Sequence, residues 1–367
     1  MKKKIVILGS TGSIGKTLIN IIKQNKKNFE IVLLSADKNF SEIYKQSKLL
    51  NVKNLIITDH KNFELFKRKY KNKKNVFNNF DDLDRILKKK VDYTMCAISG
   101  LAGLEPTIRM INKTKNIAIA NKESIICGWN IIKKNLEKYK TKFIPVDSEH
   151  FSIWSLIKKD NIKLIDKIHI TASGGPFLKW PIKKIRKANP SHALKHPNWS
   201  MGKKISIDSA TMMNKVFEVI ETQRIFDLKK SKINILIHQK SYVHAIVEFK
   251  NGLKKILVHD TDMRIPIFNT LYQNDLKYIK SNKLDLTKLN NLNFQKVNIN
   301  KFPLVKILNK IPESSSLYET VLTSANDELV NLFLENKISF YDIQKNLTKL
   351  INLREFGALR KKTPKNI

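Results

Sequence analysis

The apolar positions of the chain fall in short runs that predict strands, and most of these runs are followed by a helical pattern. Each of the early runs leads into glycine or polar residues before the helical spacing begins. This order of strand, loop and helix is typical of α/β domains built on a parallel sheet. In the first part of the chain, strands are expected at residues 5–8, 31–35, 92–99, 117–120 and 143–146.

A glycine-rich loop follows the first of these runs. It reads Gly-Ser-Thr-Gly-Ser-Ile-Gly over residues 9–15, and a helix is expected from residue 16 to residue 25. Glycines let the backbone approach a pyrophosphate, which then lies at the helix N-terminus. The spacing is GxxGxxG instead of GxGxxG, so a plain strand-to-helix turn is the alternative. We predict a Rossmann-like dinucleotide-binding domain over residues 1–146.

The turn after the second expected strand decides which dinucleotide is favoured. An acidic residue at this position favours a free ribose 2′-hydroxyl, whereas a basic residue accepts a 2′-phosphate. Both types occur here, as Asp37 and Lys38, and Asn39 follows. The residues alone leave the choice between NADH and NADPH open.

The pattern beyond residue 146 predicts a second α/β domain and a helical end. Asn251-Gly252 between two of its apolar runs is a hairpin signal. We assign residues 147–277 to this catalytic and dimerisation domain, residues 278–300 to a Lys- and Asn-rich linker, and residues 301–367 to a small helical domain. The expected strands are 164–171, 233–237, 245–249 and 256–259, and the expected terminal helices are 302–310, 315–336 and 339–350.

Residues 196–221 carry the densest set of chemical side chains. A β-type run is expected at 204–207, and Asp208 and Ser209 are N-cap candidates for the helix that follows. On that helix Asn214 and Glu218 are four residues apart and share a face, with Lys215 beside them. An amide, an ammonium and a carboxylate suit a phosphorylated substrate and a metal. A surface helix with ordinary polar residues has the same spacing.

Two carboxylates, Asp147 and Glu149, follow the strand expected at 143–146. Alternation along an extended chain puts them on one side, with Ser148 opposite. Converging carboxylates suit a hard divalent cation such as Mg²⁺ or Mn²⁺, and Glu218 is the natural third ligand. Two acids at this spacing are also common on protein surfaces.

Composition limits the class of protein. The formal net charge is +37 over 367 residues, which on its own favours nucleic acid or an anionic membrane as partner. The lysines are spread along the chain among many Asn and Ile residues, so we attribute the charge mainly to codon bias. No apolar run approaches the roughly 20 residues that span a bilayer. Cys96 and Cys127 give no disulfide framework, which fits a reducing cytoplasm.

The segment from His196 to Glu221, HPNWSMGKKISIDSATMMNKVFEVIE, resembles the signature of the 1-deoxy-D-xylulose 5-phosphate reductoisomerase family. Other blocks similar to that family occur in the same order along the chain: GSTGSIG, ANKES, DSEH, ASGG and DMRIPI. The resemblance implies conversion of 1-deoxy-D-xylulose 5-phosphate to 2-C-methyl-D-erythritol 4-phosphate in isoprenoid precursor biosynthesis. It also implies NADPH, one divalent metal (Mn²⁺ or Mg²⁺) and a homodimer in the cytoplasm, with no nucleic-acid or membrane partner.

The resemblance also implies residue roles. The metal ligands would be Asp147, Glu149 and Glu218, which with Lys122 and His196 form the catalytic set. Residues 196–202 would form a mobile flap in which Trp199 covers the ligand. Substrate would contact Lys122, Ser148, Glu149, Ser173, His196, Ser209, Asn214, Lys215 and Glu218. NADPH would contact Thr11, Gly12, Ser13, Ile14, Lys38, Asn39, Asn121, Glu123, Met201 and Gly202.

Two other functions account for part of the sequence. Another NAD(P)-dependent dehydrogenase of a phosphorylated substrate would need the glycine loop but no metal carboxylates, so its activity would survive chelation. A basic nucleic-acid-binding protein would show a steep salt dependence of binding. It leaves the glycine loop and the ordered acids unexplained.

Overall fold

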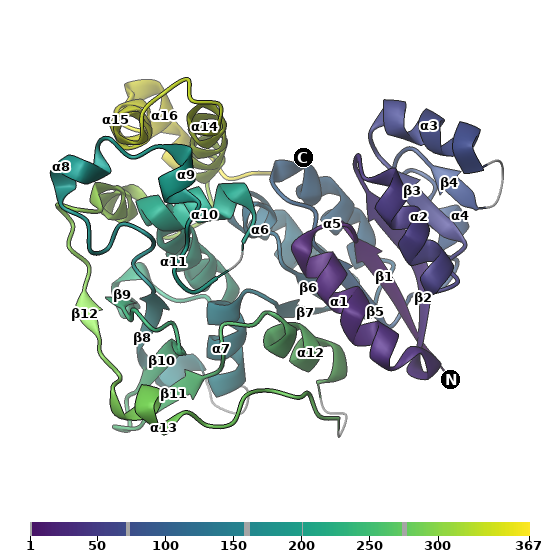
Figure 1. Cartoon of the computed structure of the whole chain (residues 1–367), viewed down its shortest axis with the longest axis horizontal. Helices are drawn as coiled ribbons and strands as arrows, with labels where there is room; N and C mark the ends of the chain where they lie inside the picture. The colour runs from purple at the N-terminus through teal and green to yellow at the C-terminus, as the bar shows by residue number, and fades with distance from the viewer. Residues whose placement is uncertain (1, 71–73, 158–161, 200, 274–276) are drawn as a thin grey trace.

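The computed structural model describes residues 2–70, 74–157, 162–199, 201–273 and 277–367, and its N-terminal part is built on a parallel sheet (Figure 1). The seven strands lie in the order β4-β3-β2-β1-β5-β6-β7. The five strands predicted in this region are confirmed, as β1, β2, β5, β6 and β7, and β3 and β4 are additional. The bounds are β1 (Lys3–Leu8), β2 (Phe29–Ala36), β3 (Asn54–Ile57), β4 (Asn75–Phe77), β5 (Tyr93–Cys96), β6 (Asn116–Ile119) and β7 (Lys142–Pro145).

The strand order reverses between β1 and β5, which is the switch point at which Rossmann-like sheets bind ligands. Apolar side chains cover both faces of the sheet in two separate clusters, one around Leu18 and Phe66 and the other around Met110 and Ile132. The Rossmann-like prediction is therefore confirmed. The helices of this region are α1 (Ser13–Gln24), α2 (Phe40–Leu49), α3 (His60–Tyr70), α4 (Leu83–Ile86), α5 (Leu104–Ile111) and α6 (Lys122–Lys138).

A second, mixed sheet has the order β11-β10-β8-β9-β12. β10 and β11 pair antiparallel across Asn251-Gly252, so the predicted hairpin is confirmed. Ile153 of α7 and Val219 of α11 pack against this sheet. The bounds are α7 (Ser148–Ile157), β8 (Ile165–Ala172), α11 (Met213–Ile225), β9 (Ile233–Ile237), β10 (Val243–Phe249), β11 (Lys254–Val258) and β12 (Gln295–Lys296).

The predicted strand at 204–207 is wrong, because α10 (Lys203–Thr211) is helical there. Ile205 and Ile207 alternate with polar residues and so imitate a strand. Burial instead follows the helical spacing of Ile207 and Ala210, and Lys204 forms an i,i+4 ion pair with Asp208. Asp208 and Ser209 therefore lie inside this helix and are not N-caps.

The helix that carries Glu218 begins after a break at Met212. That residue has φ +63°, a left-handed conformation that ends α10 and turns the chain into α11. Val216 and Phe217 of α11 are buried against the C-terminal helices. Asn214 and Glu218 share a face of α11, as expected.

The C-terminal residues form a helical layer on α6 and α11. The helix predicted at 302–310 is a 3₁₀ helix, η5 (Pro303–Lys310), and the region expected to be a linker contributes β12, which pairs with β9. The remaining helices are α8 (Ile182–Ile185), α9 (Pro190–Ala193), α12 (Arg264–Tyr272), α13 (Leu286–Asn290), α14 (Leu317–Leu334), α15 (Phe340–Leu350) and α16 (Arg354–Ala358). The short 3₁₀ segments are η1 (Lys26–Asn28), η2 (Leu101–Gly103), η3 (Ile162–Leu164), η4 (Lys230–Lys232) and η6 (Leu359–Lys361).

Helix α12 follows β11 of the second sheet and returns to the first sheet. It packs beside α1, and the hydroxyl of Thr270 lies 3.0 Å from that of Tyr93 on β5. Ile267 and Leu271 join the same apolar cluster as Leu18. The domain ranges drawn along the sequence stay predictions, and α12 shows that the packing crosses them.

No helix of the described segments is both long enough and apolar enough to cross a membrane.

Candidate active site

The glycine loop has the close backbone packing that its sequence predicts. Gly9 has φ +76°, and a Cβ there would lie 2.5 Å from the carbonyl oxygen of Ala97. A Cβ on Gly15 would lie 2.4 Å from the carbonyl oxygen of Gly9. These two glycines let β1, the loop after β5 and the start of α1 meet. Gly12 and Ser13 remain exposed at the N-terminus of α1, where a pyrophosphate would bind.

One cavity of about 600 Å³ joins this loop to the second sheet. Its wall runs from the ends of β1, β5 and β6 to β8, α10 and α11. Trp199 and His244 also line it. The predicted site residues in its wall are Gly12, Ser13, Ile14, Asn121, Lys122, Glu123, Asp147, Ser148, Glu149, Ser173, His196, Met201, Gly202, Ser209, Asn214, Lys215 and Glu218.

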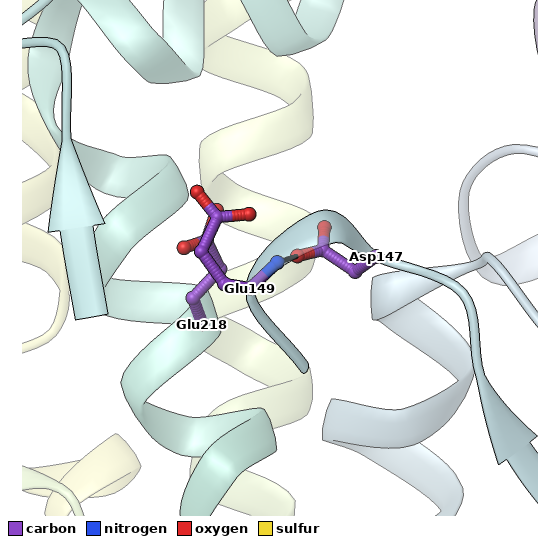
Figure 2. A group of neighbouring side chains, drawn as sticks. All are labelled: Asp147, Glu149 and Glu218. Atoms are coloured by element: carbon purple, nitrogen blue, oxygen red, sulfur yellow. Dashed lines mark hydrogen bonds between the residues drawn. The ribbon is translucent and has the colours of Figure 1, made fainter. Parts of the chain in front are cut away.

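The three predicted metal ligands meet in this wall (Figure 2). Asp147 precedes α7, Glu149 lies in its first turn and Glu218 comes from α11, yet carboxylate oxygens of all three lie within 4.8 Å of one another. The extended alternation expected for Asp147 and Glu149 is wrong, because the helix begins at Ser148. The backbone N–H of Glu149 instead donates to Asp147 Oδ1 at 3.2 Å, which draws the two acids together.

Two lysines balance these acids. Lys122 pairs with Asp147 and lies 3.6 Å from Glu218, and Lys215 pairs with both Glu149 and Glu218. Both lysines are buried, and the nearby carboxylates hold their pKa above the ordinary value although burial opposes this. Each ammonium group thus lies beside carboxylates whose negative charge it offsets.

The acidic cluster fits a divalent cation. Burial, and then the neighbouring Glu149 carboxylate, raise the pKa of Glu218 to about 8, so the metal-free folded state favours its protonated form at neutral pH. Its Oε2 contacts the Lys215 ammonium, and Oδ1 of the adjacent Asn214 accepts no hydrogen bond. Three converging carboxylates are the hard oxygen ligand set that Mg²⁺ and Mn²⁺ prefer.

This pKa predicts how the metal-free protein responds to pH. The unfolded-state pKa of Glu218 is near 4.5 and its folded value is about 8, so the folded state binds the extra proton between these values. The contribution of this group to stability is complete below pH 4.5 and is lost as the pH rises through 8. We expect the free energy of unfolding in EDTA to fall over this range more steeply in the wild type than in Glu218→Gln. Denaturant titration at pH 5.5 and 8 tests this, and equal slopes would contradict it.

His196 and Ser173 form a second polar pair across the cavity. His196 Nδ1 accepts hydrogen bonds from the backbone N–H groups of Asn198 and Trp199, at 3.2 and 3.0 Å. Its Nε2 therefore carries the proton and donates to Ser173 Oγ at 3.0 Å. Burial lowers the pKa of His196 to about 4, so the ring is a neutral hydrogen-bond donor at physiological pH. Ser200, in the middle of the expected flap, lies outside the described residues.

Lys204 centres a further ion cluster in the cavity wall. Its ammonium pairs with Glu123 and lies 3.3 Å from Asp208 and 3.0 Å from Asp327 of α14. Asn326 donates to Asp208 at 2.8 Å. This cluster joins α6, α10 and α14 beside the cofactor half of the cavity.

Replacing Lys204 by Met leaves three acids around a largely buried site with one cation fewer. We expect the free energy of unfolding at pH 7.5 to fall by about 3 kcal/mol, because truncating one partner of a buried ion cluster leaves uncompensated charge. Lys203→Met is the control, since Lys203 is exposed. Because burial raises the pKa of Asp208 and Asp327, the loss should shrink at pH 5. Equal losses in both variants would contradict the assignment.

Three predicted cofactor residues do not line the cavity. Thr11, Lys38 and Asn39 are absent from its wall, and Asn39 caps α2 by accepting from the backbone of Glu42 at 3.1 Å. Asp37 accepts a hydrogen bond from Thr58 at 3.0 Å. Lys38 is exposed on the same turn, at the edge where an adenosine ribose would lie. Their cofactor roles stay predictions.

Asn121 serves the fold as well as the wall. Its side chain caps α6, and its amide donates to the carbonyl oxygen of Gly100 at 2.8 Å. In the structure the same residue caps the helix and ties the loop after β5 to it.

Several polar residues of this region were not predicted as site residues. Glu221, His150 and Asp208 are buried and Lys204 is partly buried, all beside predicted site residues, and His244 lines the cavity. Glu221 follows Glu218 by three residues on α11, so helical spacing was the available signal. Lys204 lies in the segment 204–207 that was incorrectly predicted as a strand, and Asp208 directly follows it. The strand pattern gives no indication of the i,i+4 ion pair between them.

A Rossmann-like sheet whose switch point opens into a cavity with a three-carboxylate centre defines a dinucleotide- and metal-dependent oxidoreductase. Three family models match the chain: 1-deoxy-D-xylulose 5-phosphate reductoisomerase over residues 5–128, its C-terminal domain over 143–226, and a second DXP reductoisomerase C-terminal domain over 259–367. The chain belongs to the 1-deoxy-D-xylulose 5-phosphate reductoisomerase family. The expectation from the sequence is confirmed.

Curated relatives carry the same name. The chain is 58% identical to the 1-deoxy-D-xylulose 5-phosphate reductoisomerase of Pelagibacter ubique over 100% of this chain and 95% of the relative. It is 40% identical to that of Wolbachia pipientis wMel, over 93% of this chain and 88% of the relative.

Solved structures of the family superpose on the whole fold. The reductoisomerase from Zymomonas mobilis in complex with NADPH matches with a TM-score of 0.89 and 32% identity, covering 100% of this chain and 94% of that one. A DOX-P reductoisomerase in complex with NADPH, fosmidomycin and magnesium also matches with a TM-score of 0.89, at 31% identity. It covers 98% of this chain and 91% of that one.

Proposed function

We propose that the protein converts 1-deoxy-D-xylulose 5-phosphate to 2-C-methyl-D-erythritol 4-phosphate, with NADPH as reductant and a divalent metal as cofactor. The observation that carries the proposal is the convergence of Asp147, Glu149 and Glu218 in a cavity that also reaches the glycine loop. A dehydrogenase that only transfers hydride needs the loop but not the three acids. The relatives named above support the same reaction.

The acids would hold the metal, which supplies a Lewis acid for the substrate's carbonyl and hydroxyl oxygens. Lys122 and Lys215 would then share these carboxylates with the cation. Lys215 and Asn214 line the cavity beside Glu218, so they can turn toward a substrate phosphate with Ser173 and Ser209. Binding of the substrate phosphate by these residues would supply binding energy away from the reaction centre, and this energy would position the reacting carbons.

His196 would donate a hydrogen bond to substrate from Nε2, in place of the bond it makes to Ser173. The two backbone N–H groups at Nδ1 fix this tautomer and orient the ring. Because His196 is neutral at physiological pH, it adds no positive charge that would compete with the metal. Lys122, whose ammonium pairs with Asp147, would be a second donor of a hydrogen bond or proton to a developing alkoxide.

NADPH supplies the hydride and would lie along the glycine loop, with its nicotinamide near Met201 and its nucleotide end near Lys38. Lys38 is exposed beside Asp37, whose carboxylate is held by Thr58. We expect NADPH to be preferred over NADH by kcat/KM, and Lys38→Met to narrow that preference about tenfold, since one phosphate contact is lost. The control is Lys53→Met, an exposed lysine before β3. An unchanged preference in Lys38→Met would contradict the assignment.

Further properties follow from the family. We propose that Mn²⁺ can replace Mg²⁺ in the same carboxylate site, since both accept hard oxygen ligands.

We propose a homodimer that uses the open edge of β11, where Leu253 and Ile256 are exposed. The enzyme would act in the cytoplasm, in keeping with two buried free cysteines. Light scattering of the purified protein tests the dimer.

Product analysis tests the proposed reaction. Incubation of 1-deoxy-D-xylulose 5-phosphate with NADPH and Mg²⁺ should give 2-C-methyl-D-erythritol 4-phosphate in a one-to-one ratio to oxidised NADPH. Reduction without rearrangement would give an unbranched polyol phosphate, and that product would favour the dehydrogenase alternative. Fosmidomycin, present in two of the matching structures, should inhibit the reaction.

A further inference from the structure

A fourth carboxylate, Glu221, lies beneath the three acids and outside the cavity wall. Its side chain is 2% exposed, and its Oε2 accepts no hydrogen bond. The same oxygen lies 3.5 Å from Lys122 Nζ and 3.9 Å from His150 Nδ1. Glu221 is therefore buried in direct contact with Lys122, a predicted catalytic residue, but it does not line the cavity.

Lys122 is shared by three carboxylates, and only one of them is free of the metal site. Asp147 and Glu218 are predicted metal ligands, whereas Glu221 lies one turn further along α11. His150 also contacts Asp147, at 3.4 Å, and its Nε2 donates to the Glu218 carbonyl oxygen at 3.0 Å, with the Thr222 hydroxyl 3.1 Å away. A cation among the three acids would therefore draw away two of the three partners of Lys122.

We infer that Glu221 is a positioning residue that retains Lys122 beside the substrate when Asp147 and Glu218 bind a metal. The inference rests on the proposed function, because it takes the three acids as the metal ligands. A buried ammonium needs a carboxylate partner, since isolated burial of its charge is strongly unfavourable. Without Glu221, Lys122 would either keep Asp147 from the metal or leave the site.

A double-mutant cycle on metal binding isolates this effect. The dissociation constant of Mn²⁺ is measured by electron paramagnetic resonance, without substrate or NADPH, for the wild type, Glu221→Gln, Lys122→Met and the double variant. A field effect of the Glu221 charge on Mn²⁺ acts equally with and without Lys122, so it cancels in the cycle. An effect of Glu221 that acts through the position of Lys122 is lost in the Lys122→Met background, so it remains as a coupling between the two substitutions.

We expect Glu221→Gln to weaken Mn²⁺ binding about tenfold more in the wild-type background than in the Lys122→Met background, a coupling within the range seen for contacting residues. Lys122→Met alone should tighten Mn²⁺ binding, because a competitor for Asp147 is removed. Glu221→Asp, which keeps the charge, should restore part of the coupling. A coupling below about twofold would overturn the inference.

Two controls separate the possible failures. If the wild type binds no Mn²⁺, the proposed metal site fails, and this inference fails with it. If the wild type binds Mn²⁺ and the cycle shows no coupling, only the role of Glu221 fails. Thermal unfolding of each variant identifies loss of fold, and Lys122→Gln replaces Lys122→Met should the latter unfold.

Discussion

Replacing Glu218 by Gln is expected to lower metal-dependent turnover about a thousandfold, because loss of one charged ligand removes several kcal/mol of metal binding and Lewis-acid stabilisation. The change keeps the size of the side chain and its hydrogen bond with Asn214. It removes the only one of the three acids that is fully buried, with 1% of its side chain exposed. The measurement is kcat/KM for 1-deoxy-D-xylulose 5-phosphate across a range of Mg²⁺ concentrations.

The same variant should be at least as stable as the wild type when metal is absent. The pKa of Glu218 is raised to about 8, so the uncharged form is the one the folded state favours at neutral pH, and Gln resembles it. Activity and stability thus change in opposite directions. Glu328→Gln, an exposed acid on α14, is the control and should change neither. A destabilised Glu218→Gln with full turnover would refute the metal assignment.

Replacing Lys215 by Met is expected to lower kcat/KM for the phosphorylated substrate about a thousandfold, because a desolvated ammonium that binds phosphate contributes about 4 kcal/mol. Lys215 is buried, lines the cavity and is held beside Glu149 and Glu218. Its loss should leave Mn²⁺ binding intact or tighter, since it also balances these acids. This distinguishes it from Glu218→Gln, which should weaken Mn²⁺ binding.

The control for Lys215 is Lys229→Met, an exposed lysine after α11 that lies outside the cavity wall. It should keep kcat/KM within about twofold of the wild type, because exposed single charges contribute little. Equal losses in the two variants would mean that the effect reflects net charge. An unchanged kcat/KM in Lys215→Met would place the phosphate elsewhere in the cavity.

The sequence predicts the first sheet well because its strands are continuous apolar runs with glycine or polar residues at their ends. The same feature locates Gly12, Asn121 and Asp147, since the carboxyl ends of parallel strands meet at one edge. Asn214 and Glu218 follow from helical spacing alone. The ligand chemistry of a divalent cation makes Glu218 a candidate partner of Asp147, and the family resemblance supports the same assignment.

The errors come from contacts between distant segments. The strand expected at 204–207 fails because the ion pairs of Lys204 with Glu123 and Asp327 stabilise a helix, and those partners lie far away in sequence. The sequence pattern predicts only that Glu221 is a polar residue on a helix, because its contact with Lys122 of α6 joins segments that are distant in the chain. Helix α12 joins the first sheet for the same reason, through Thr270 and Tyr93.

The most direct test of the central claim is NADPH oxidation by the purified protein with 1-deoxy-D-xylulose 5-phosphate, followed with Mg²⁺ and again after EDTA. The three-carboxylate centre predicts turnover with Mg²⁺ or Mn²⁺, none in EDTA, and recovery when metal is restored. Turnover that persists in EDTA would mean that Asp147, Glu149 and Glu218 do not form a catalytic metal site. That result would contradict the account.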